Sequence, residues 1–555
     1  MMKMHTRLLS LLLAMIILVT LCACGGGSSA AETSAEVSTP SAAETPSTET
    51  AAAVAASTEE ESETVAYPVM EEPTTFSFWF PESGPFGTYI NSWNENVVFA
   101  RMAELTNIEF DFKSTPSDAA SESFSLMIAS EDYTDLIYGF ASYYPESMDN
   151  AIDDDVIMDL SELAAEFAPE YYNAITNEEP AVVNLAMSDS GKLWGIHRVY
   201  EQQQIGIGLM MRKDLLDGLN LEVPTTYDEM EEALMAITNE CMPNGAVLLN
   251  TSGFLDLFGG SYDFSAGYEI GTLDNPFINK NGTAVYTPAT DGWHDYLEMM
   301  ARWYDKGIVN QDFPSMPGSD FFATISSAEV AVVDFFFDQC ANFTNTASDS
   351  NCDMIGVPYP SQEAGEQLHL LCADPRLRTD MSVVISNKCE DPGILLEYFN
   401  YFWTPEGMTL ANYGIEGEHY NVDDAGNPIL TDSRKSDISI LDDVYTYRAG
   451  PTLVLQDYFD QTLDEKSYDC LATWTASNDG SYVMPNITFT SDETYSLSGL
   501  QGELATYVSE YALRVICGQE DLDSSWDAYI ANIEALNYEE IQSIYQTALD
   551  RFLSK

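Results

Sequence analysis

The sequence changes character near residue 73, and this break limits where a hydrophobic core can form. From Gly25 to about Glu72 the chain is rich in Gly, Ser, Ala, Thr and Glu, with no Lys, no Arg and almost no large apolar residue before Tyr67. Such a segment cannot bury enough apolar surface to offset the entropy lost on folding, so we expect a disordered tether over residues 24–72. The folded body is then expected over residues 73–555, which is long enough to hold two hydrophobic cores.

Residues 1–24 have the three parts of an export signal. Two basic residues precede an apolar run over residues 8–21, which ends in Leu21-Cys22-Ala23-Cys24. This run of about 14 residues is shorter than the ~20 that span a bilayer, so a cleaved signal peptide is favoured over a permanent membrane helix. Its ending resembles the bacterial lipobox. The resemblance implies that residues 1–23 are removed, that Cys24 receives a lipid, and that acyl chains hold the protein at the extracellular face of the cytoplasmic membrane.

The charge balance argues against nucleic acid as a partner. Lys and Arg total 21 against 90 Asp and Glu, which gives a formal net charge of -69. Such a charge repels phosphate backbones and anionic membrane surfaces. We therefore expect no nucleic-acid binding, and contact with a membrane only through the N-terminal lipid.

The start of the body alternates between strand and helix patterns. Strand-like runs at 74–80, 108–112 and 135–138 are separated by segments with helical spacing at 93–105 and 124–129. Strands separated by helices pair in parallel through crossover connections, which indicates an α/β fold. Ligands of such sheets collect at the carboxyl ends of the strands.

Two later segments have helix signals of their own. Thr226 precedes Glu229 by three residues, which predicts a capping box at the start of a helix. Near the C-terminus, apolar residues recur with helical spacing and predict one buried helix face. These residues are Trp526, Tyr529, Ile530, Ile533 and Leu536.

A series of short motifs follows along the body in a characteristic order. They lie at residues 104–109, 126–139, 190–196, 211–216, 223–230, 404–407, 413–420, 516–518 and 526–529. Behind a lipobox, this order resembles extracellular solute-binding protein family 1, the binding lipoproteins of bacterial ABC importers. The resemblance covers the chain from about residue 73 to residue 555.

This resemblance implies a two-lobed, periplasmic-binding-protein-like α/β fold of type II. Each lobe would be a mainly parallel sheet flanked by helices, and a hinge would join the two. Lobe 1 would comprise residues 73–203 and 378–450, and lobe 2 would comprise residues 204–377 and a helical return at 451–555. The resemblance also implies a monomer that captures a small solute by lobe closure, with carbohydrates favoured, and delivers it to the membrane subunits of an ABC permease.

Recognisable catalytic motifs are missing from the sequence. It contains no His-Glu-x-x-His, no Gly-x-Ser-x-Gly and no phosphate-binding Gly-Lys-Ser/Thr loop, and its five histidines are far apart. We therefore expect neither an enzyme nor a cofactor. Two alternatives stay open: a lipid-anchored surface polysaccharide hydrolase, and a ligand-sensing or adhesion protein without transport.

The sequence gives little indication of a metal site or of disulfides. Many members of the family carry a calcium loop after the helix that begins near Thr226, but residues 238–246 place Cys, Met and Ala at acidic positions, so we expect no metal. The nine cysteines are scattered, and only Cys22 and Cys24 are closely spaced. This spacing indicates no disulfide framework, although one or two bridges stay open.

Sugars present apolar ring faces and a rim of hydroxyl groups, so their sites combine aromatic side chains with carboxylates, amides and Arg. We expect such residues in loops after strands, near the crossings between lobes, and on residues 329–338, which resemble a family strand that leads to the sugar. Trp79 and Phe336 are the strongest candidates, although packing explains each aromatic residue equally well. The full set is Trp79, Glu82, Tyr143, Tyr144, Trp194, Arg198, Asp334, Phe336, Asp338, Arg376, Trp403 and Tyr420.

Overall fold

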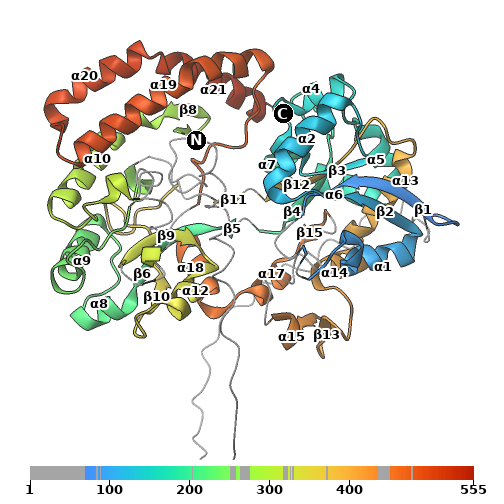
Figure 1. Cartoon of the computed structure of the whole chain (residues 1–555), viewed down its shortest axis with the longest axis horizontal. Coiled ribbons are helices and arrows are strands. Elements are labelled where there is room, and N and C mark those ends of the chain that lie inside the picture. Colours follow the sequence, from blue (N-terminus) through green and yellow to red (C-terminus); the bar gives the residue numbers. More distant parts are fainter. Residues whose placement is uncertain are drawn as a thin grey trace, which may run out of the picture. The chain divides into compact units, whose positions relative to one another are not determined.

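The computed structural model describes residues 69–554, with gaps at 83–85, 88, 203, 250–257, 263–275, 317–322, 326, 328–329, 370–372, 375, 436–450 and 477–478 (Figure 1). The predicted signal peptide, Cys24 and nearly all of the predicted tether lie outside these residues. Packing begins at the start of this part: the Met70 N–H donates to the Thr106 carbonyl at 3.1 Å, and the Asn107 side chain donates to the Met70 carbonyl at 2.7 Å. Among the described helices, none is long and apolar enough to cross a bilayer.

Six strands from distant parts of the chain form a mixed sheet, here called the large sheet. They are β1 (Thr74–Trp79), β2 (Ile108–Lys113), β3 (Leu136–Tyr138), β4 (Ile196–Tyr200), β12 (Leu377–Ile385) and β15 (Leu453–Val454). Their order in the sheet is β15-β4-β12-β3-β1-β2. β1 pairs in parallel with β2 and β3, as predicted, and β15 pairs in parallel with β4, whereas β12 runs antiparallel to both of its neighbours.

The first crossover of the large sheet is set by local sequence. Helix α1 (Val97–Thr106) starts at Asn96, whose side chain accepts hydrogen bonds from two N–H groups of the first turn, and it stops at Asn107 in the left-handed region (φ 58°). Asn suits both ends, because its short amide caps a helix and tolerates positive φ. Together with the short helix η1 (Trp93–Glu95), α1 confirms the predicted helix at 93–105.

Further helices cover the large sheet. The predicted helix at 124–129 is confirmed as part of α2 (Ala120–Ser130). The others are α3 (Phe140–Tyr143), α4 (Met148–Asp153), α5 (Ser161–Phe167), α6 (Pro169–Thr176), α7 (Pro180–Ala186), α13 (Pro392–Asn400) and α14 (Pro405–Tyr413). A hairpin of β13 (Tyr420–Val422) and β14 (Pro428–Leu430) and the short helix α15 (Asp432–Lys435) follow.

Aromatic rings dominate the core of the large sheet. On one face, the ring of Phe78 lies 5.1 Å from that of Phe80, 5.4 Å from that of Phe110 and 5.5 Å from that of Phe112, measured between centroids. Trp79 is the next residue of the strand and therefore points to the opposite face, where it belongs to a second, smaller cluster. Both faces of the sheet are thus buried, as expected where helices cover a partly parallel sheet.

A second sheet, here called the small sheet, has three strands: β6 (Ile207–Arg212), β9 (Val332–Phe336) and β10 (Met354–Gly356). Its order is β10-β6-β9, and both pairs are antiparallel, so the expectation of a mainly parallel sheet is wrong here. The helix α12 (Gln339–Thr346) carries the chain from β9 to β10, which run in the same direction. These two strands lie on either side of β6, which runs the opposite way, so no parallel neighbours result.

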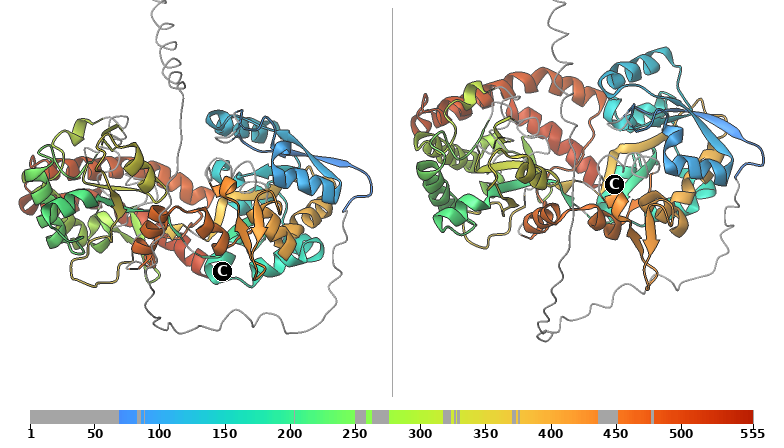
Figure 2. Two further views of the ribbon diagram at one scale, coloured as in Figure 1. Left: turned by 90° about the horizontal axis from the view of Figure 1, so that it is seen from below. Right: turned by 60° about the horizontal axis from the view of Figure 1, so that its bottom comes forward.

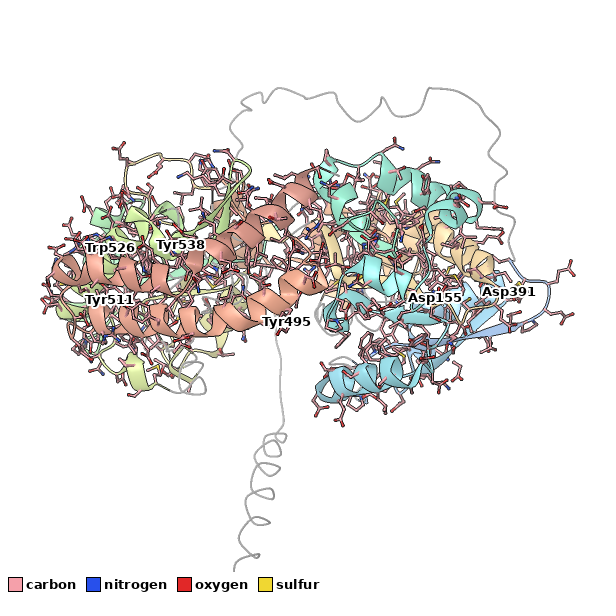
Figure 3. All side chains as sticks on the ribbon, turned by 90° about the horizontal axis from the view of Figure 1, so that it is seen from above. Asp155, Asp391, Tyr495, Tyr511, Trp526 and Tyr538 are labelled. Atoms are coloured by element: carbon pink, nitrogen blue, oxygen red, sulfur yellow. The ribbon has the colours of Figure 1, made fainter. Side chains whose placement is uncertain are left out.

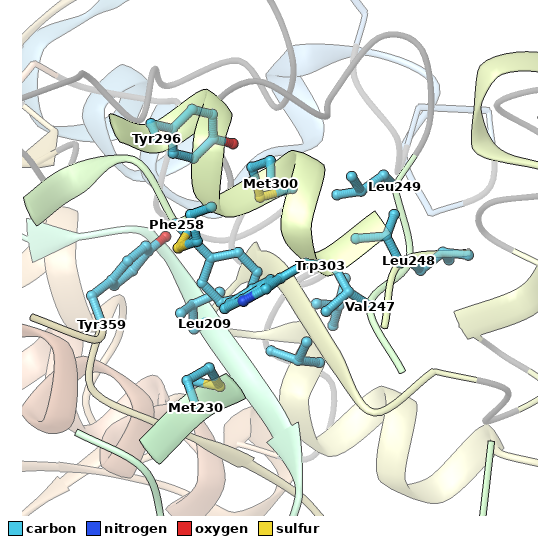
Figure 4. Close-up of a cluster of buried hydrophobic side chains, with 14 of the residues drawn as sticks. Leu209, Met230, Val247, Leu248, Leu249, Phe258, Tyr296, Met300, Trp303 and Tyr359 are labelled. Atoms are coloured by element: carbon cyan, nitrogen blue, oxygen red, sulfur yellow. The ribbon is translucent and has the colours of Figure 1, made fainter. Parts of the chain in front are cut away.

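The small sheet is covered by helices that share one large core. They are α8 (Lys213–Leu219), α9 (Tyr227–Glu240) and α10 (Asp291–Asp305), and the hairpin of β7 (Phe277–Lys280) and β8 (Thr283–Tyr286) precedes α10. Figure 4 shows part of this core, where Leu209 of β6 and Met230 of α9 lie near Phe258 and Trp303. The predicted capping box is confirmed at the start of α9.

The C-terminal part adds three long helices to the same core: α19 (Ser491–Ile516), α20 (Leu522–Ala535) and α21 (Tyr538–Leu553). They are red in Figures 1 and 2 and stay adjacent in every view. The predicted apolar face of α20 is confirmed: Tyr529 and Ile533 are buried, and the ring of Tyr529 stacks on those of Tyr511 (4.2 Å) and Trp526 (5.0 Å). Tyr511 and Trp526 are labelled on neighbouring helices in Figure 3.

The chain connects the two sheets three times. β4 continues through β5 (Gln204–Ile205) into β6, and β11 (Ala373–Asp374) leads back into β12. β5 and β11 pair with each other, so the first two connections run side by side in opposite directions. The third connection leaves β15 through α17 (Gln456–Thr462) and enters α18 (Glu465–Thr475), which packs on the small sheet.

Candidate ligand-binding cavity

A cavity of about 420 Å³ lies between residues of the large-sheet region and residues near the C-terminus. This volume falls within the range of ~300–1,000 Å³ that small-molecule sites occupy. One side is formed by Ala141 and Trp194, by Thr379 of β12, and by residues 146–148, 184–185 and 187–189. The other side is formed by residues 484–489 and Tyr545. Segments far apart in the sequence therefore meet around this space.

Trp194 forms a fixed aromatic part of the cavity wall. Its side chain is 2% exposed, and its indole N–H donates to the Leu185 carbonyl at 3.0 Å. The edge of the ring meets His197, whose imidazole contacts the Ser382 hydroxyl at 2.7 Å and the Ala186 carbonyl at 3.2 Å. Burial lowers the pKa of His197 to about 3, so this residue is neutral and supports the wall without adding charge.

Hydrogen bonds hold the polar side of the cavity in place. The Asp149 carboxylate accepts from the Ser188 hydroxyl (2.6 Å), from the Ser190 hydroxyl (2.5 Å) and from the Ser190 N–H (2.9 Å). Burial raises the pKa of Asp149, but these hydrogen bonds and Lys192 outweigh burial, and the net effect is a lowered pKa. The ionised carboxylate therefore fixes the loop after α7, which carries the lining residue Ser188.

A charged network joins the two sides of the cavity at its rim. The guanidinium of Arg551 donates to Asp189 at 2.8 Å, to Glu493 at 2.8 Å and to the Thr488 carbonyl at 2.6 Å. The Thr488 hydroxyl contacts both Asp189 carboxylate oxygens at 2.8 Å. Asn184 adds a hydrogen bond of 3.0 Å to a backbone carbonyl near the end of α21. These contacts connect the large-sheet region to the C-terminal helices.

Of the twelve candidate residues from the sequence, Trp194 lines this cavity. Trp79, Tyr143 and Tyr144 belong with Trp194 to the smaller cluster of the large sheet and are not among the lining residues. Trp79 is 3% exposed and its ring meets that of Tyr143 at 5.3 Å, while the ring of Tyr144 stacks on Phe140 at 4.9 Å. Burial, with smaller contributions from nearby acidic residues, raises the pKa of Tyr144 to about 12.

The candidates on and after β9 lie outside the cavity. The Asp334 carboxylate is 8% exposed and accepts a hydrogen bond of 2.5 Å from the Tyr359 hydroxyl. Burial raises the pKa of Asp334 to about 7. The hydrogen bond from Tyr359 offsets only part of this shift, and among the described residues no cation contributes to lowering the pKa. Phe336 is 38% exposed, and Asp338 is exposed at the start of α12.

The remaining candidates lie near the connections or on the large-sheet region. Arg376 donates to Glu178 at 3.0 Å and to the Tyr200 carbonyl at 2.9 Å, next to β11. Arg198 is buried within β4, and Trp403 is 9% exposed in the large-sheet core. Glu82 and Tyr420 are partly buried, after β1 and at the start of β13 respectively.

Sequence reasoning missed most of the polar residues around the cavity. Asn184, Thr379, Asn486 and Thr488 supply amide and hydroxyl groups there, but they are separated by up to about 300 positions. No motif marks them, because amides and hydroxyls occur throughout the sequence. Only the fold identifies them as neighbours.

Metal binding finds no support in the described part of the chain. Among those residues, no three His, Cys, Asp or Glu side chains gather closely enough to hold a metal ion. Residues 238–246, after α9, belong to this part. The expectation that this loop binds no calcium stays a prediction.

Comparisons with known proteins identify relatives along the chain. No protein-family model matches it. The chain is 24% identical to the polygalacturonan/rhamnogalacturonan-binding protein YtcQ of Bacillus subtilis over 324 residues, which cover 57% of this chain and 62% of that relative. It is 21% identical to the fructooligosaccharide ABC transporter substrate-binding protein FusA of Streptococcus pneumoniae over 522 residues, or 88% of this chain and 92% of FusA. The lipoprotein LipO of Bacillus subtilis is 22% identical over 50% of this chain and 55% of its own length.

Solved structures show the same fold over most of the body. An EF-hand mutant of FusA in complex with fructo-nystose superposes with a TM-score of 0.64 at 18% identity, covering 87% of this chain and 100% of that one. A milk-oligosaccharide (HMO) binding protein of Bifidobacterium longum infantis superposes with a TM-score of 0.67 at 16% identity, covering 87% and 99%.

The fold and the sequence similarity together define the class: this chain is an extracellular solute-binding protein. In sequence it is similar to a substrate-binding protein of an ABC transporter over 88% of its length, and it shares the fold of that protein. The predicted family is therefore confirmed. The names of FusA and YtcQ describe binding proteins, so the prediction that the chain is not an enzyme is confirmed as well.

Proposed function

We propose that this chain is the substrate-binding lipoprotein of a bacterial ABC importer and that it captures an oligosaccharide. The observation that carries the proposal is the similarity to FusA over 88% of this chain and 92% of FusA, which binds fructooligosaccharides. YtcQ, named as a polygalacturonan/rhamnogalacturonan-binding protein, is matched over 62% of its length. These relatives favour oligosaccharides as the class of ligand, without favouring one sugar.

The chemistry of the cavity is compatible with a sugar. Trp194 offers an aromatic ring, Phe489 and Met484 are apolar, and Asn486 and Thr379 carry groups that hydrogen-bond to hydroxyls. A sugar has both apolar ring faces and a polar rim, so it needs this combination. The cavity is our proposed binding site, and Phe336 and Asp338, near the paired connections, are proposed as additional contacts.

The proposed mechanism is closure of two lobes on the ligand. Lobe 1 comprises the large sheet, at 73–203 and 377–454, and lobe 2 comprises the small sheet with the C-terminal helices, at 204–376 and from α18 onward. The predicted bounds at 377 and 450 move, because β12 begins at Leu377 and β15 (Leu453–Val454) pairs with β4 in the large sheet. The paired strands β5 and β11 and the segment after β15 are the proposed hinge. A ligand that contacts both lobes stabilises the closed state, which the permease subunits then recognise.

The proposed location is the extracellular face of the cytoplasmic membrane. Its support is the lipobox-like motif that ends at Cys24 and the relationship to LipO, a lipoprotein. The lipid would be the protein's contact with the membrane, and the ABC permease would be its protein partner. We propose that the protein acts as a monomer.

Thermal unfolding with a ligand panel tests this function. The panel contains fructooligosaccharides, galacturonan and rhamnogalacturonan fragments, milk-type oligosaccharides, monosaccharides and short peptides. A ligand at 100 times its Kd adds about 2.7 kcal/mol to the free energy of unfolding, so an oligosaccharide that binds raises Tm measurably. The bound sugar is then recovered and analysed by mass spectrometry, and we expect it unchanged.

Two variants test whether the sugar binds in the proposed cavity. Asn486→Ala and Thr379→Val each remove a hydrogen-bonding group from the cavity, and we expect the Kd to rise about tenfold. Tyr495→Ala is the matched control, because Tyr495 is 83% exposed on α19 (Figure 3) and outside the cavity. Recovery of a shortened sugar would favour a hydrolase instead, and stabilisation by peptides alone would contradict the sugar assignment.

A further inference from the structure

Helix α18 is pressed against the small sheet at two glycines. A Cβ atom added to Gly208 of β6 would lie 2.3 Å from the indole of Trp474, and one added to Gly356 of β10 would lie 2.8 Å from the sulfur of Cys470. Cys470 and Trp474 are four residues apart, so they share one face of α18. The Trp474 indole N–H also donates to the Leu209 carbonyl at 3.0 Å. These contacts fix the height and rotation of α18 on the sheet.

Helix α12 brings a second thiol close to β10. The Cys340 thiol donates to the Met354 carbonyl at 3.3 Å, two residues before Gly356, where Cys470 packs. Both sulfur atoms therefore lie close to β10, beside residues that are two positions apart. Helices α12 and α18 also contact each other, each of the two thiols shifts the pKa of the other, and both side chains are 0% exposed.

We propose that Cys340 and Cys470 form a disulfide that ties α12 to α18 in the exported protein. Two buried thiols that pack beside residues 354 and 356 of one short strand, on helices that contact each other, can approach as closely as a disulfide requires. Of the other cysteines described, Cys241 is exposed, Cys517 is partly buried, and Cys352 and Cys389 are buried. Oxidation is expected because disulfides persist outside the cell, which is the one part of the inference that rests on the proposed location.

The oxidation balances with a disulfide such as oxidised glutathione as the oxidant. The Cys340 thiolate attacks it, forming a mixed disulfide and releasing one glutathione thiolate. The Cys470 thiolate then attacks the Cys340 sulfur and releases the second glutathione, and the two thiol protons end on the two glutathione molecules. Cys340 is suited to attack first, because the hydrogen bond from the Cys470 thiol lowers its pKa.

The bond would stabilise the part of the small-sheet region that carries candidate ligand contacts. α12 directly follows Phe336 and Asp338, and α18 follows the third connection from the large sheet. The two cysteines are 130 positions apart, so a bond between them closes a long loop and restricts the unfolded chain strongly. Reduction would therefore lower the free energy of unfolding and release α12 from α18.

Peptide mapping of refolded protein tests the pairing. The full mature chain is unfolded, refolded in a mixture of oxidised and reduced glutathione, alkylated, digested without reductant and analysed by mass spectrometry. We expect a linked pair of peptides that contains Cys340 and Cys470, lighter than the sum of its parts by two hydrogen atoms. Recovery of both cysteines in alkylated form, or linkage of either to another cysteine, would overturn the proposal.

Thermal unfolding with and without reductant supplies an independent measurement. We expect reduction to lower Tm of the wild type by at least about 3 °C. Cys340→Ser and Cys470→Ser should abolish this difference, while the control Cys389→Ala in the other core should keep it. No difference in the wild type contradicts a stabilising bond. A linked pair after refolding together with a reduced pair in protein taken from cells supports the pairing and contradicts the proposed location.

Discussion

The large-sheet and small-sheet regions are built in different ways. In the large sheet, the parallel strands β1, β2 and β3 follow one another within 65 residues, and rings such as Phe78 and Phe110 come from neighbouring strands. In the small sheet, β6 is separated from its partner β9 by about 120 residues, and its core depends on α18 and on helices from the end of the chain. The strands β1 to β3, whose partners are near in sequence, could be predicted from it, whereas the pairing of distant strands could not.

The largest expected effects on the free energy of unfolding come from removing one buried aromatic ring from each of the two cores. Phe78→Ala in the large sheet and Trp303→Ala in the small-sheet region each remove a ring that is at most 1% exposed, and we expect each to cost about 3–5 kcal/mol. Because the two cores are separate, calorimetry should show two transitions, with each variant lowering only one. A single transition that both variants lower equally would show that the regions unfold together.

The buried carboxyl of Asp334 should make the small-sheet region sensitive to pH. Its pKa is raised from 3.8 to about 7, so the folded chain keeps the proton between pH 4 and 7 while the unfolded chain loses it. The free energy of unfolding therefore falls as pH rises through this window, by no more than about 4 kcal/mol, and levels off above it. Asp334→Asn retains an acceptor for Tyr359 and should flatten the curve.

The measurement is the difference between wild-type and variant unfolding free energies at each pH from 4 to 8. Asp424→Asn on the exposed turn after β13 is the control, and its difference should stay near zero throughout. A pH-independent difference for Asp334→Asn would mean that Asp334 is ionised in the folded protein.

The close approach of α18 to the small sheet predicts a smaller but specific effect. Gly208→Ala places a Cβ atom 2.3 Å from Trp474, whose indole is held by Leu209, so we expect a loss of about 2–3 kcal/mol. Gly499→Ala in α19 is the matched control, because nothing lies within 4 Å of its added Cβ atom. The control should be neutral or gain up to about 1 kcal/mol, since Ala favours a helix over Gly. Equal unfolding free energies for the two variants would show that α18 can shift away from β6 at little cost.

The smallest expected effect concerns the charged network at the cavity rim. Asp189→Asn weakens its contacts with Arg551 and Thr488, which join the two regions, and we expect about 1 kcal/mol, or a roughly fivefold rise in the Kd of the sugar. Asp111→Asn, in an exposed ion pair within the large sheet, should leave the Kd unchanged. An unchanged Kd in both variants would show that the charged network at the cavity rim does not contribute to sugar binding.

Several features could be predicted because each depends on neighbours in sequence. The helix at 93–105 and the capping box of Thr226 and Glu229 use contacts a few residues apart, and the parallel strands β1 and β2 on either side of the helix pair only 34 positions apart. The apolar face of α20 follows from helical spacing alone. The antiparallel small sheet was mispredicted, because the direction in which β9 returns to β6 depends on the whole intervening chain.

The candidate site could be predicted only in part for the same reason. Trp194 and Trp79 are both tryptophans, one near a predicted crossing between lobes and the other near the end of a predicted strand, so the sequence made both of them candidates. Trp194 lines the cavity, whereas Trp79 is buried in the smaller cluster and does not. A sequence gives the residue type, and the direction of the side chain follows from which face of the sheet is covered.

By itself, the sequence determined the break near residue 73, the acidic surface, the α/β class and the family, because composition and ordered motifs are properties of the chain. Only the tertiary structure decided which distant residues meet: Thr379 with Asn486 around one cavity, Asp189 with Arg551 at its rim, and Cys340 with Cys470 over β10. These pairings depend on how sheets and helices pack, and packing energy is shared among many residues that no local pattern records.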